Sequence, residues 1–255
     1  MFFYKLIFML LGFKKNILHK SPLILNNKII SISPGGYKGF YELGVCKYIK
    51  QHYNLDNFLF SGASAGAWVS LVFCFKRDFS EIQDKVLDNS IAESKTMKGL
   101  ENLIRNKILT HFTTDDFDLE KLYIGTTTIQ NFKIKTTIYH NFTGLEDALN
   151  CCRASSHIPL ITAGIKNMYR NVLTFDGGFS KYPYLHNTED TILHITPNIW
   201  KKDERVKKTT YLLRFTDYTT LFSRDRYNFN DMIEEGYKDS KDNKEYLDSI
   251  FKGKL

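Results

Sequence analysis

Several markers of specialised protein classes are missing from this sequence. The 255-residue chain has only four cysteines, and none lies in a C-x-x-C motif or in a Cys/His cluster with the spacing of a zinc site. We therefore expect neither a disulfide framework nor a metal site, and we expect free thiols in a reducing compartment. No hydrophobic run reaches the roughly 18 to 20 residues that cross a bilayer. No segment is long and polar enough to indicate disorder.

The chain has fewer acidic than basic residues. The chain has 35 Lys and Arg against 28 Asp and Glu, which gives a net charge of +7. Such a charge either attracts an anionic partner, a membrane or a nucleic acid, or only solvates the surface. No helix-turn-helix, zinc-finger or RNP-like pattern is present, so we expect no nucleic-acid partner.

The N-terminal segment is apolar but short. Residues 2–13 are FFYKLIFMLLGF, and Lys14 and Lys15 follow without the small-residue cleavage site of a signal peptide. Two interpretations stay open. Residues 1–20 contact a membrane surface, with aromatic and Leu side chains among the headgroups, or they pack on the domain. We divide the chain into this segment, residues 1–27, and one domain over residues 28–255.

Alternating strand and helix patterns predict the fold. A β-branched strand at 28–33 ends in a Pro-Gly-Gly loop and is followed by a helix over 39–51, and a strand at 58–61 leads into a buried helix. The further predicted strands are 122–129, 132–140, 171–175 and 190–196, and the further predicted helices are 79–112, 145–155 and 227–252. This alternation indicates an α/β fold with a mostly parallel sheet and helices on both faces.

A candidate nucleophile lies between the second strand and its helix. Gly62, Ser64 and Gly66 form a G-x-S-x-G pattern. In that context the glycines permit a sharp strand-to-helix turn that exposes the serine, and the helix N-terminus favours developing negative charge. The alternative is a structural turn of small residues, but the apolar strand before and the buried helix after favour a nucleophile.

The loop after the first strand, residues 33–39, is a candidate oxyanion hole. Its glycines let backbone N–H groups approach a ligand closely. A dinucleotide site fits poorly because Pro34 occupies the first glycine position, and a Walker A loop fails because G-K-[ST] is absent. An oxyanion hole has one donor after the nucleophile and another in an early glycine-rich loop. These donors would be the N–H groups of Ala65 and of residues in the stretch Gly35, Gly36 and Tyr37.

Asp176 is the candidate base. It ends the strand at 171–175 and precedes Gly177 and Gly178. The carboxyl ends of parallel strands share one edge of a sheet, where ligands bind, so we expect Asp176 to lie near Ser64. The alternative interpretation of D-G-G is an ordinary turn.

A histidine-based triad is the competing arrangement. In α/β hydrolases the histidine follows the acid, and only His186 and His194 follow Asp176. His194 lies inside a predicted strand, and His186 lies in a polar stretch without glycine or helix context. A Ser–Asp dyad is therefore the more economical hypothesis.

Together these motifs resemble those of the patatin-like phospholipases. A glycine-rich loop, a G-x-S-x-G about 25 residues later and a late D-G-[AG] are the pattern of that family, and the likeness covers roughly residues 28–185. The stretch Gly39 to Val45, GFYELGV, is similar to the animal branch that contains adipose triglyceride lipase and adiponutrin. Residues 154–159, ASSHIP, resemble the small-residue segment with proline that precedes the aspartate strand.

The resemblance implies a fold, an activity and a set of site residues. It implies a three-layer α/β/α fold with a Ser–Asp dyad, in which Ser64 is the nucleophile, Asp176 the proton acceptor, and Gly35, Gly36 and Gly39 form the oxyanion loop. It implies hydrolysis of acyl esters of phospholipids or neutral glycerolipids without a metal or other cofactor. With it we expect contact with a membrane or lipid-droplet surface and an intracellular, peripherally membrane-associated protein.

One position departs from the family pattern. Pro34 replaces the first glycine of the loop, and proline donates no N–H. We expect the donors to lie on later residues, so that activity survives. The alternative is a catalytically inactive protein that keeps the fold and binds lipid.

Overall fold

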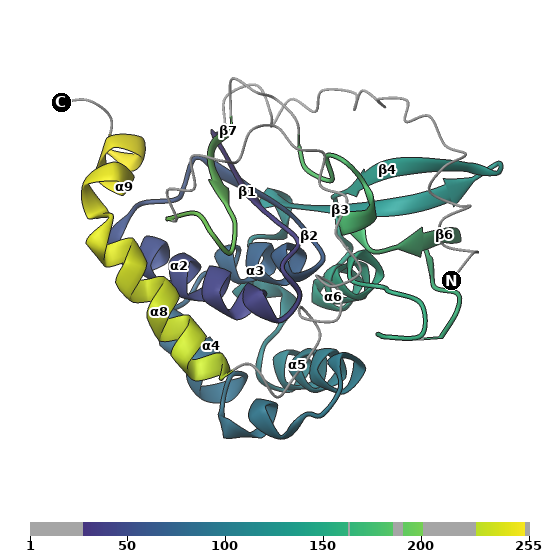
Figure 1. Ribbon diagram of the computed structural model, residues 1–255, viewed down its shortest axis with the longest axis horizontal. Coiled ribbons are helices and arrows are strands. Elements are labelled where there is room, and N and C mark those ends of the chain that lie inside the picture. Colours follow the sequence, from purple (N-terminus) through teal and green to yellow (C-terminus); the bar gives the residue numbers. More distant parts are fainter. Residues whose placement is uncertain (1–27, 163, 186–190, 201–227, 253–255) are drawn as a thin grey trace.

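One sheet forms the centre of the protein. In the computed structural model, which describes residues 28–162, 164–185, 191–200 and 228–252, seven strands join in the order β5-β6-β3-β2-β1-β7, with β4 paired to β3 (Figure 1). The strands are β1 (Lys28–Ile32), β2 (Phe58–Ala63), β3 (Leu122–Gln130), β4 (Lys133–Tyr139), β5 (Met168–Tyr169), β6 (Val172–Phe175) and β7 (Thr191–Ile195).

The central strands are parallel and the outer ones are not. β7, β1, β2 and β3 pair in parallel, whereas β4 and β6 each pair antiparallel with β3 and β5 pairs antiparallel with β6. β1 and β2 are almost wholly buried, as their continuous apolar runs predict for central strands. The predicted mixed α/β fold, with a mostly parallel central sheet flanked by helices, is confirmed.

The length of β3 determines where the antiparallel strand β6 ends. β2 pairs with residues 122–125 of β3, and β6 pairs with residues 127–129 farther along. β6 runs in the opposite direction, from Leu173 opposite Ile129 to Phe175 opposite Thr127, so its carboxyl end returns toward the end of β2. The sequence-based expectation that this strand is parallel to β2 is therefore wrong, although the end of the strand lies where that expectation placed it.

Helices follow the parallel strands. Figure 1 shows α2 (Gly39–His52), α3 (Ala65–Phe73) and α6 (Leu145–Ser155) along one face of the sheet. The predicted helix over 79–112 is divided into α4 (Phe79–Lys85), the short turn η3 (Asn89–Glu93) and α5 (Met97–His111). Asp88 and Thr96 cause the division, because each side chain accepts a backbone N–H at the start of a new helical segment. The predicted helix over 227–252 is likewise α8 (Phe229–Asp242) followed by α9 (Lys244–Phe251).

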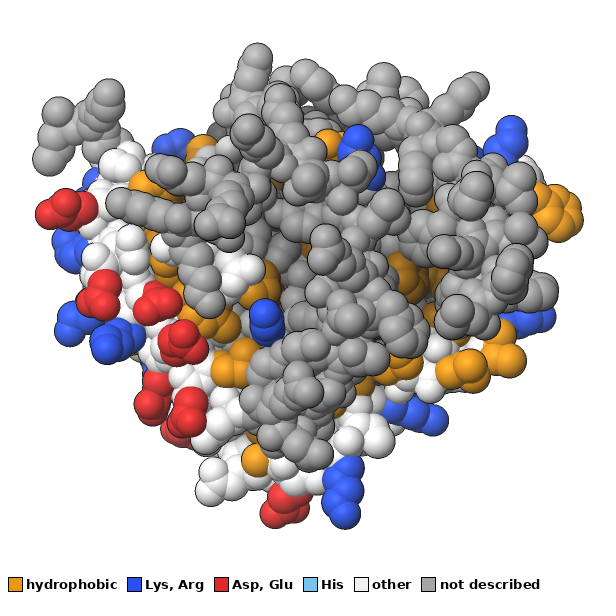
Figure 2. Space-filling model, in the orientation of Figure 1, with side chains coloured by type: hydrophobic (Ala, Val, Ile, Leu, Met, Phe, Trp, Pro, Cys, Tyr) orange, Lys and Arg blue, Asp and Glu red, His pale blue; other side chains and the backbone are white. Residues whose placement is uncertain are grey.

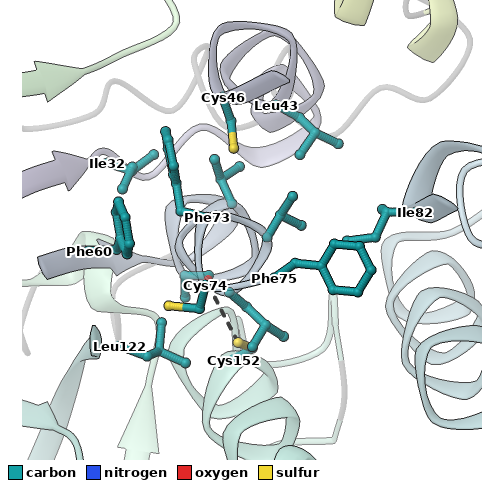
Figure 3. Packing of buried hydrophobic residues seen from close by; sticks show 14 of the residues in the cluster. Ile32, Leu43, Cys46, Phe60, Phe73, Cys74, Phe75, Ile82, Leu122 and Cys152 are labelled. Atoms are coloured by element: carbon teal, nitrogen blue, oxygen red, sulfur yellow. Dashed lines mark hydrogen bonds between the residues drawn. The ribbon is translucent and has the colours of Figure 1, made fainter. Parts of the chain in front are cut away.

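α3 lies in the middle of the hydrophobic core. Figure 3 shows this helix surrounded by side chains from both neighbouring layers, with Ile32 and Phe60 from the strands, Leu43 from α2 and Ile82 from α4. The four cysteines are buried here as free thiols, as the sequence analysis expected.

α2 and α8 cross at two glycines. A Cβ atom at Gly44 would lie 2.1 Å from the carbonyl oxygen of Ile233, and one at Gly236 would lie 2.1 Å from that of Tyr41. Because these neighbours are backbone atoms, no side chain fits at either position. α8 therefore packs directly against α2, and the glycine loop of the site directly precedes the N-terminus of α2.

Candidate active site

Ser64 lies on a strained turn between β2 and α3. Its φ of 54° is in the left-handed region, with ψ at −125°, a conformation that a non-glycine residue adopts only where its surroundings impose it. Gly62 and Gly66 supply those surroundings: a Cβ at Gly62 would lie 2.0 Å from the carbonyl oxygen of Gly66, and one at Gly66 would lie 2.3 Å from that of Ile32. The G-x-S-x-G pattern thus has the strand–turn–helix context that a nucleophile requires.

The structure brings Ser64 and Asp176 together. Ser64 Oγ donates a hydrogen bond to Asp176 Oδ2 over 2.7 Å, and both side chains are buried. The other oxygen, Asp176 Oδ1, accepts the backbone N–H of Gly178 at 2.6 Å. Burial raises the pKa of the Asp176 carboxyl to about 6, and the hydrogen bonds from Ser64 and Gly178 oppose that rise. Such a carboxyl is ionised at neutral pH and is a stronger base than an exposed aspartate.

The backbone of Asp176 is held on both sides. Its N–H donates to the carbonyl oxygen of His157 at 2.8 Å, and its own carbonyl accepts the hydroxyl of Thr127 at 2.9 Å. Gly177 permits the close approach, because a Cβ there would lie 2.7 Å from the Cβ of Ala63 at the end of β2. The D-G-G sequence is therefore a packed contact with the nucleophile strand and not an exposed turn.

Ser155 is a site residue that the sequence analysis did not assign. Its Oγ accepts the backbone N–H of Ser64 at 2.8 Å and donates to the carbonyl oxygen of Gly125 at 2.7 Å. The side chain is fully buried at the end of α6. The ASSHIP segment was the available signal, but its spacing does not show which neighbour the hydroxyl meets.

The glycine loop reaches the same cavity as the dyad. Gly36, Tyr37 and Ala65 line this cavity together with Ser64 and Asp176. Gly36 has a φ of 54°, which opens the short helix η2 (Gly36–Lys38). The first N–H groups of a helix have no acceptor within it, so neither α3 nor η2 itself supplies an acceptor for the N–H groups of Ala65 and Gly36. Gly35 is not among the cavity-lining residues of the described chain, and its carbonyl accepts the N–H of Lys38 at 3.0 Å.

Pro34 lies apart from these donors. It is absent from the lining of the cavity as the described residues form it, and its ring lies next to Gly178, where a Cβ atom would approach it to 3.2 Å. Gly39, in contrast, lines the cavity and lies against Ala65, because a Cβ at Gly39 would lie 2.7 Å from that side chain. The proline thus packs the loop against the D-G-G turn, and the missing N–H is not at the cavity wall.

An apolar cavity of about 100 Å³ extends from Ser64 between α3, α4 and α5. Its deep lining is hydrophobic: Trp68, Val69, Val72, Ile82, Val86, Leu87, Met97, Leu100, Ile104 and Ile108. The acidic side chain Glu101 interrupts this lining, beside Ser156, whose Oγ accepts the indole N–H of Trp68 at 3.3 Å. Burial raises the pKa of Glu101 to about 8, so the carboxyl is neutral at pH 7. The hydrophobic part of the cavity therefore carries no charge at neutral pH, and the ionised Asp176 lies beside Ser64 where the cavity begins.

Of the two histidines in the triad hypothesis, the one that the structure describes does not pair with Asp176. His194 lies on β7, where its Nδ1 is 2.7 Å from Ser31 Oγ, and His186 lies outside the described residues. His157 is buried near the site, but neither ring nitrogen has a hydrogen-bond partner among the residues described, and burial lowers its pKa. Over the described chain, both oxygens of the Asp176 carboxyl are taken by Ser64 and Gly178.

The described chain has neither a metal-binding cluster nor a membrane-spanning helix. No group of three or more His, Cys, Asp or Glu side chains in these ranges could hold a metal ion. None of the helices within them has the length and apolar character needed to cross a membrane. The apolar segment at residues 1–27 lies outside the described residues.

Comparison with known families identifies the domain. The model of the patatin-like phospholipase family matches residues 30–187, which is more than half of the chain and contains every candidate site residue. A search of the curated proteins gave no match.

Proposed function

Because the chain belongs to the patatin-like phospholipase family, whose members are lipid acyl hydrolases, we propose that it cleaves acyl esters of phospholipids or acylglycerols with a Ser64–Asp176 dyad. One observation carries the proposal: Ser64 Oγ donates directly to Asp176 Oδ2 over 2.7 Å, next to an apolar cavity. A serine hydroxyl needs a base within hydrogen-bond reach to become a nucleophile. Asp176 meets that requirement without a histidine between the two.

The first step forms an acyl-enzyme. Ser64 Oγ attacks the ester carbonyl while Asp176 accepts its proton, and the tetrahedral oxyanion accepts N–H hydrogen bonds from Ala65 and from the Gly36–Tyr37 stretch. The protonated Asp176 then gives its proton to the leaving alcohol. A pKa of about 6 suits both roles, because the carboxyl is ionised before the attack and is not too weak an acid to return the proton.

The second step releases the fatty acid. Water attacks the acyl-enzyme carbonyl, Asp176 accepts a proton from this water, and the proton returns to Ser64 Oγ as that oxygen leaves. The hydrogen bond from Gly178 to Asp176 Oδ1 keeps Oδ2 directed at the serine throughout.

The shape and lining of the cavity support a fatty acyl substrate. Burial of each methylene contributes about 0.8 kcal/mol of favourable transfer free energy, and the side chains that α3, α4 and α5 place in the lining are hydrophobic except for Glu101. We also propose contact with a membrane or lipid-droplet surface and an intracellular, peripherally membrane-associated location. The likeness to the branch of adipose triglyceride lipase and adiponutrin remains a prediction, because the family match does not distinguish branches.

An active-site label tests the proposal. The full chain is incubated with a serine-reactive fluorophosphonate, the modified residue is mapped by mass spectrometry, and hydrolysis of a short-chain soluble ester is measured in parallel. We expect the label on Ser64, and we expect Ser64→Ala to lose both labelling and turnover while keeping its circular dichroism spectrum. Turnover by Ser64→Ala at the wild-type rate would disprove the nucleophile. Absence of turnover in the wild type would instead favour the inactive lipid-binding alternative.

A further inference from the structure

Hydrophobic side chains gather on the exposed segment that precedes β6, from the loop after α6 to the start of β5. Among the described residues, seven large hydrophobic side chains are exposed, and four of them lie within nine positions: Leu160 at 74%, Ile161 at 41%, Ile165 at 68% and Met168 at 58%. We call these four residues, with Lys166, the loop surface. Isolated exposed hydrophobic residues are common, whereas a cluster of them marks a binding surface.

The loop surface is continuous with the active-site cavity. Ile158 and Thr162 line that cavity, and they flank the exposed pair Leu160 and Ile161. Hydrogen bonds fix this arrangement: the Ile158 N–H donates to Thr162 Oγ1 at 2.8 Å, and the Ile161 N–H donates to the Ile158 carbonyl at 3.1 Å. Within this short segment, Ile158 and Thr162 face the cavity, and Leu160 and Ile161 between them face the solvent.

Folding in water does not explain this exposure. Leu160 adopts a φ of 68°, which is uncommon for a non-glycine residue and costs of order 1 kcal/mol. Its side chain gains little burial in return, because it is 74% exposed. If another surface buried Leu160 and Ile165, the free energy gained by removing their apolar side chains from water would offset this cost.

The charge of this region fits an anionic surface. From residue 154 to residue 175 the chain has no Asp or Glu, and its cations are Lys166 and Arg170. Arg170 is paired with Asp147, whereas Lys166 is exposed. In Figure 2, hydrophobic and basic side chains lie together below the place that β6 has in Figure 1, whereas acidic side chains gather over α8.

We propose that the loop surface docks on a phospholipid bilayer that carries anionic headgroups, and that it places the cavity opening at the bilayer surface. This inference rests on the proposed function, because it gives the acyl chain a path from the bilayer into the cavity without crossing water. The hydrophobic side chains enter the headgroup region and Lys166 pairs with anionic headgroups.

Vesicle binding by the full chain tests the proposal. Flotation with vesicles of equal parts phosphatidylcholine and phosphatidylglycerol compares the wild type with the double variant Leu160→Asn, Ile165→Ser. Asparagine tolerates a positive φ, so the loop conformation is kept. We expect binding at least about tenfold weaker in the double variant. We expect Lys166→Glu to weaken binding about tenfold on these vesicles and to change it little on phosphatidylcholine alone.

Phe132→Asn is the matched control. Phe132 is 96% exposed with a φ of 58°, and it lies at the turn between β3 and β4, away from the cavity lining. We expect wild-type binding from this variant. Unchanged binding in the double variant, or an equal loss in Phe132→Asn, would overturn the proposal. So would loss of binding to phosphatidylcholine alone by Lys166→Glu.

Hydrolysis of a short soluble ester separates this inference from the proposed function. We expect the double variant to keep wild-type turnover of that ester and to lose hydrolysis of vesicle phospholipid, which also shows that it is folded. If no form of the protein cleaves the soluble ester while binding still depends on the loop surface, the proposed function fails and the docking surface stands. If the soluble ester is cleaved and vesicle hydrolysis is unaffected by the double variant, the docking surface fails alone.

Discussion

Ser155 holds the backbone of the candidate nucleophile: its hydroxyl accepts the N–H of Ser64 at 2.8 Å and donates to the carbonyl of Gly125 at 2.7 Å. This single buried oxygen connects the end of α6, the turn after β2 and the strand β3. The strained φ of Ser64 therefore depends on a residue 91 positions away.

Ser155→Ala should weaken both activity and stability. The substitution removes the acceptor of the buried Ser64 N–H and one donor to the Gly125 carbonyl, which costs about 1 to 3 kcal/mol. We expect kcat/KM for a soluble ester to fall about ten- to a hundredfold. Ser70→Ala is the matched control, since Ser70 is also buried but its hydroxyl has no partner among the described residues. Similar kinetics in the two variants would show that Ser155 does not position Ser64.

Asp176→Asn should lose activity and gain stability. Folding raises the pKa of Asp176 from 3.8 to about 6, so its contribution to stability is largest below pH 4 and is lost as the pH rises through 6. At about pH 8 the buried charge costs on the order of 3 kcal/mol. We expect the variant to unfold at a higher temperature than the wild type at that pH, and the difference to narrow toward pH 4. A less stable variant at pH 8, or wild-type turnover, would contradict the assigned role.

The rate of ester cleavage should fall in acid. The attack requires an ionised Asp176, so kcat/KM for a soluble ester should decline below a midpoint near pH 6. Steady-state kinetics across this range on an uncharged ester measure the midpoint. A profile that is flat through pH 6 would show that Asp176 is not the proton acceptor.

Glu101→Gln should also gain stability, but without losing activity. Burial raises the pKa of Glu101 from 4.5 to about 8, so its contribution to stability is lost as the pH rises from the unfolded value through 8. The neutral amide avoids that loss, and we expect a gain on the order of 2 to 3 kcal/mol in the free energy of unfolding at about pH 7.

Because Glu101 is already neutral in the folded protein at that pH, soluble-ester turnover by Glu101→Gln should stay within about threefold of the wild type. This variant is therefore the control for Asp176→Asn: both replace a buried carboxyl by its amide, and only one should abolish turnover. Loss of turnover in both variants would assign Glu101 a catalytic part that the dyad does not give it.

Local patterns allowed most of the elements to be predicted. Apolar runs and helical spacing within each element predict β1, α2, β2 and α3. The G-x-S-x-G pattern predicts the turn between β2 and α3. The divisions after α4 and after α8 do not follow from the sequence pattern, because helical spacing continues through both. After α4, the caps at Asp88 and Thr96 compete with that spacing only once the segments are packed.

The sequence by itself determined which residues are candidates: the glycine loop, Ser64 on its turn and Asp176 before two glycines, since each pattern is a property of a few neighbouring positions. Only the tertiary structure decided how they meet. The antiparallel pairing of β6 with the far half of β3 returns Asp176 to Ser64. The packing of α6 places Ser155 under the nucleophile, and α3, α4 and α5 enclose the cavity. These relations depend on the pairing of distant strands and on helix packing, and no stretch of sequence encodes them locally.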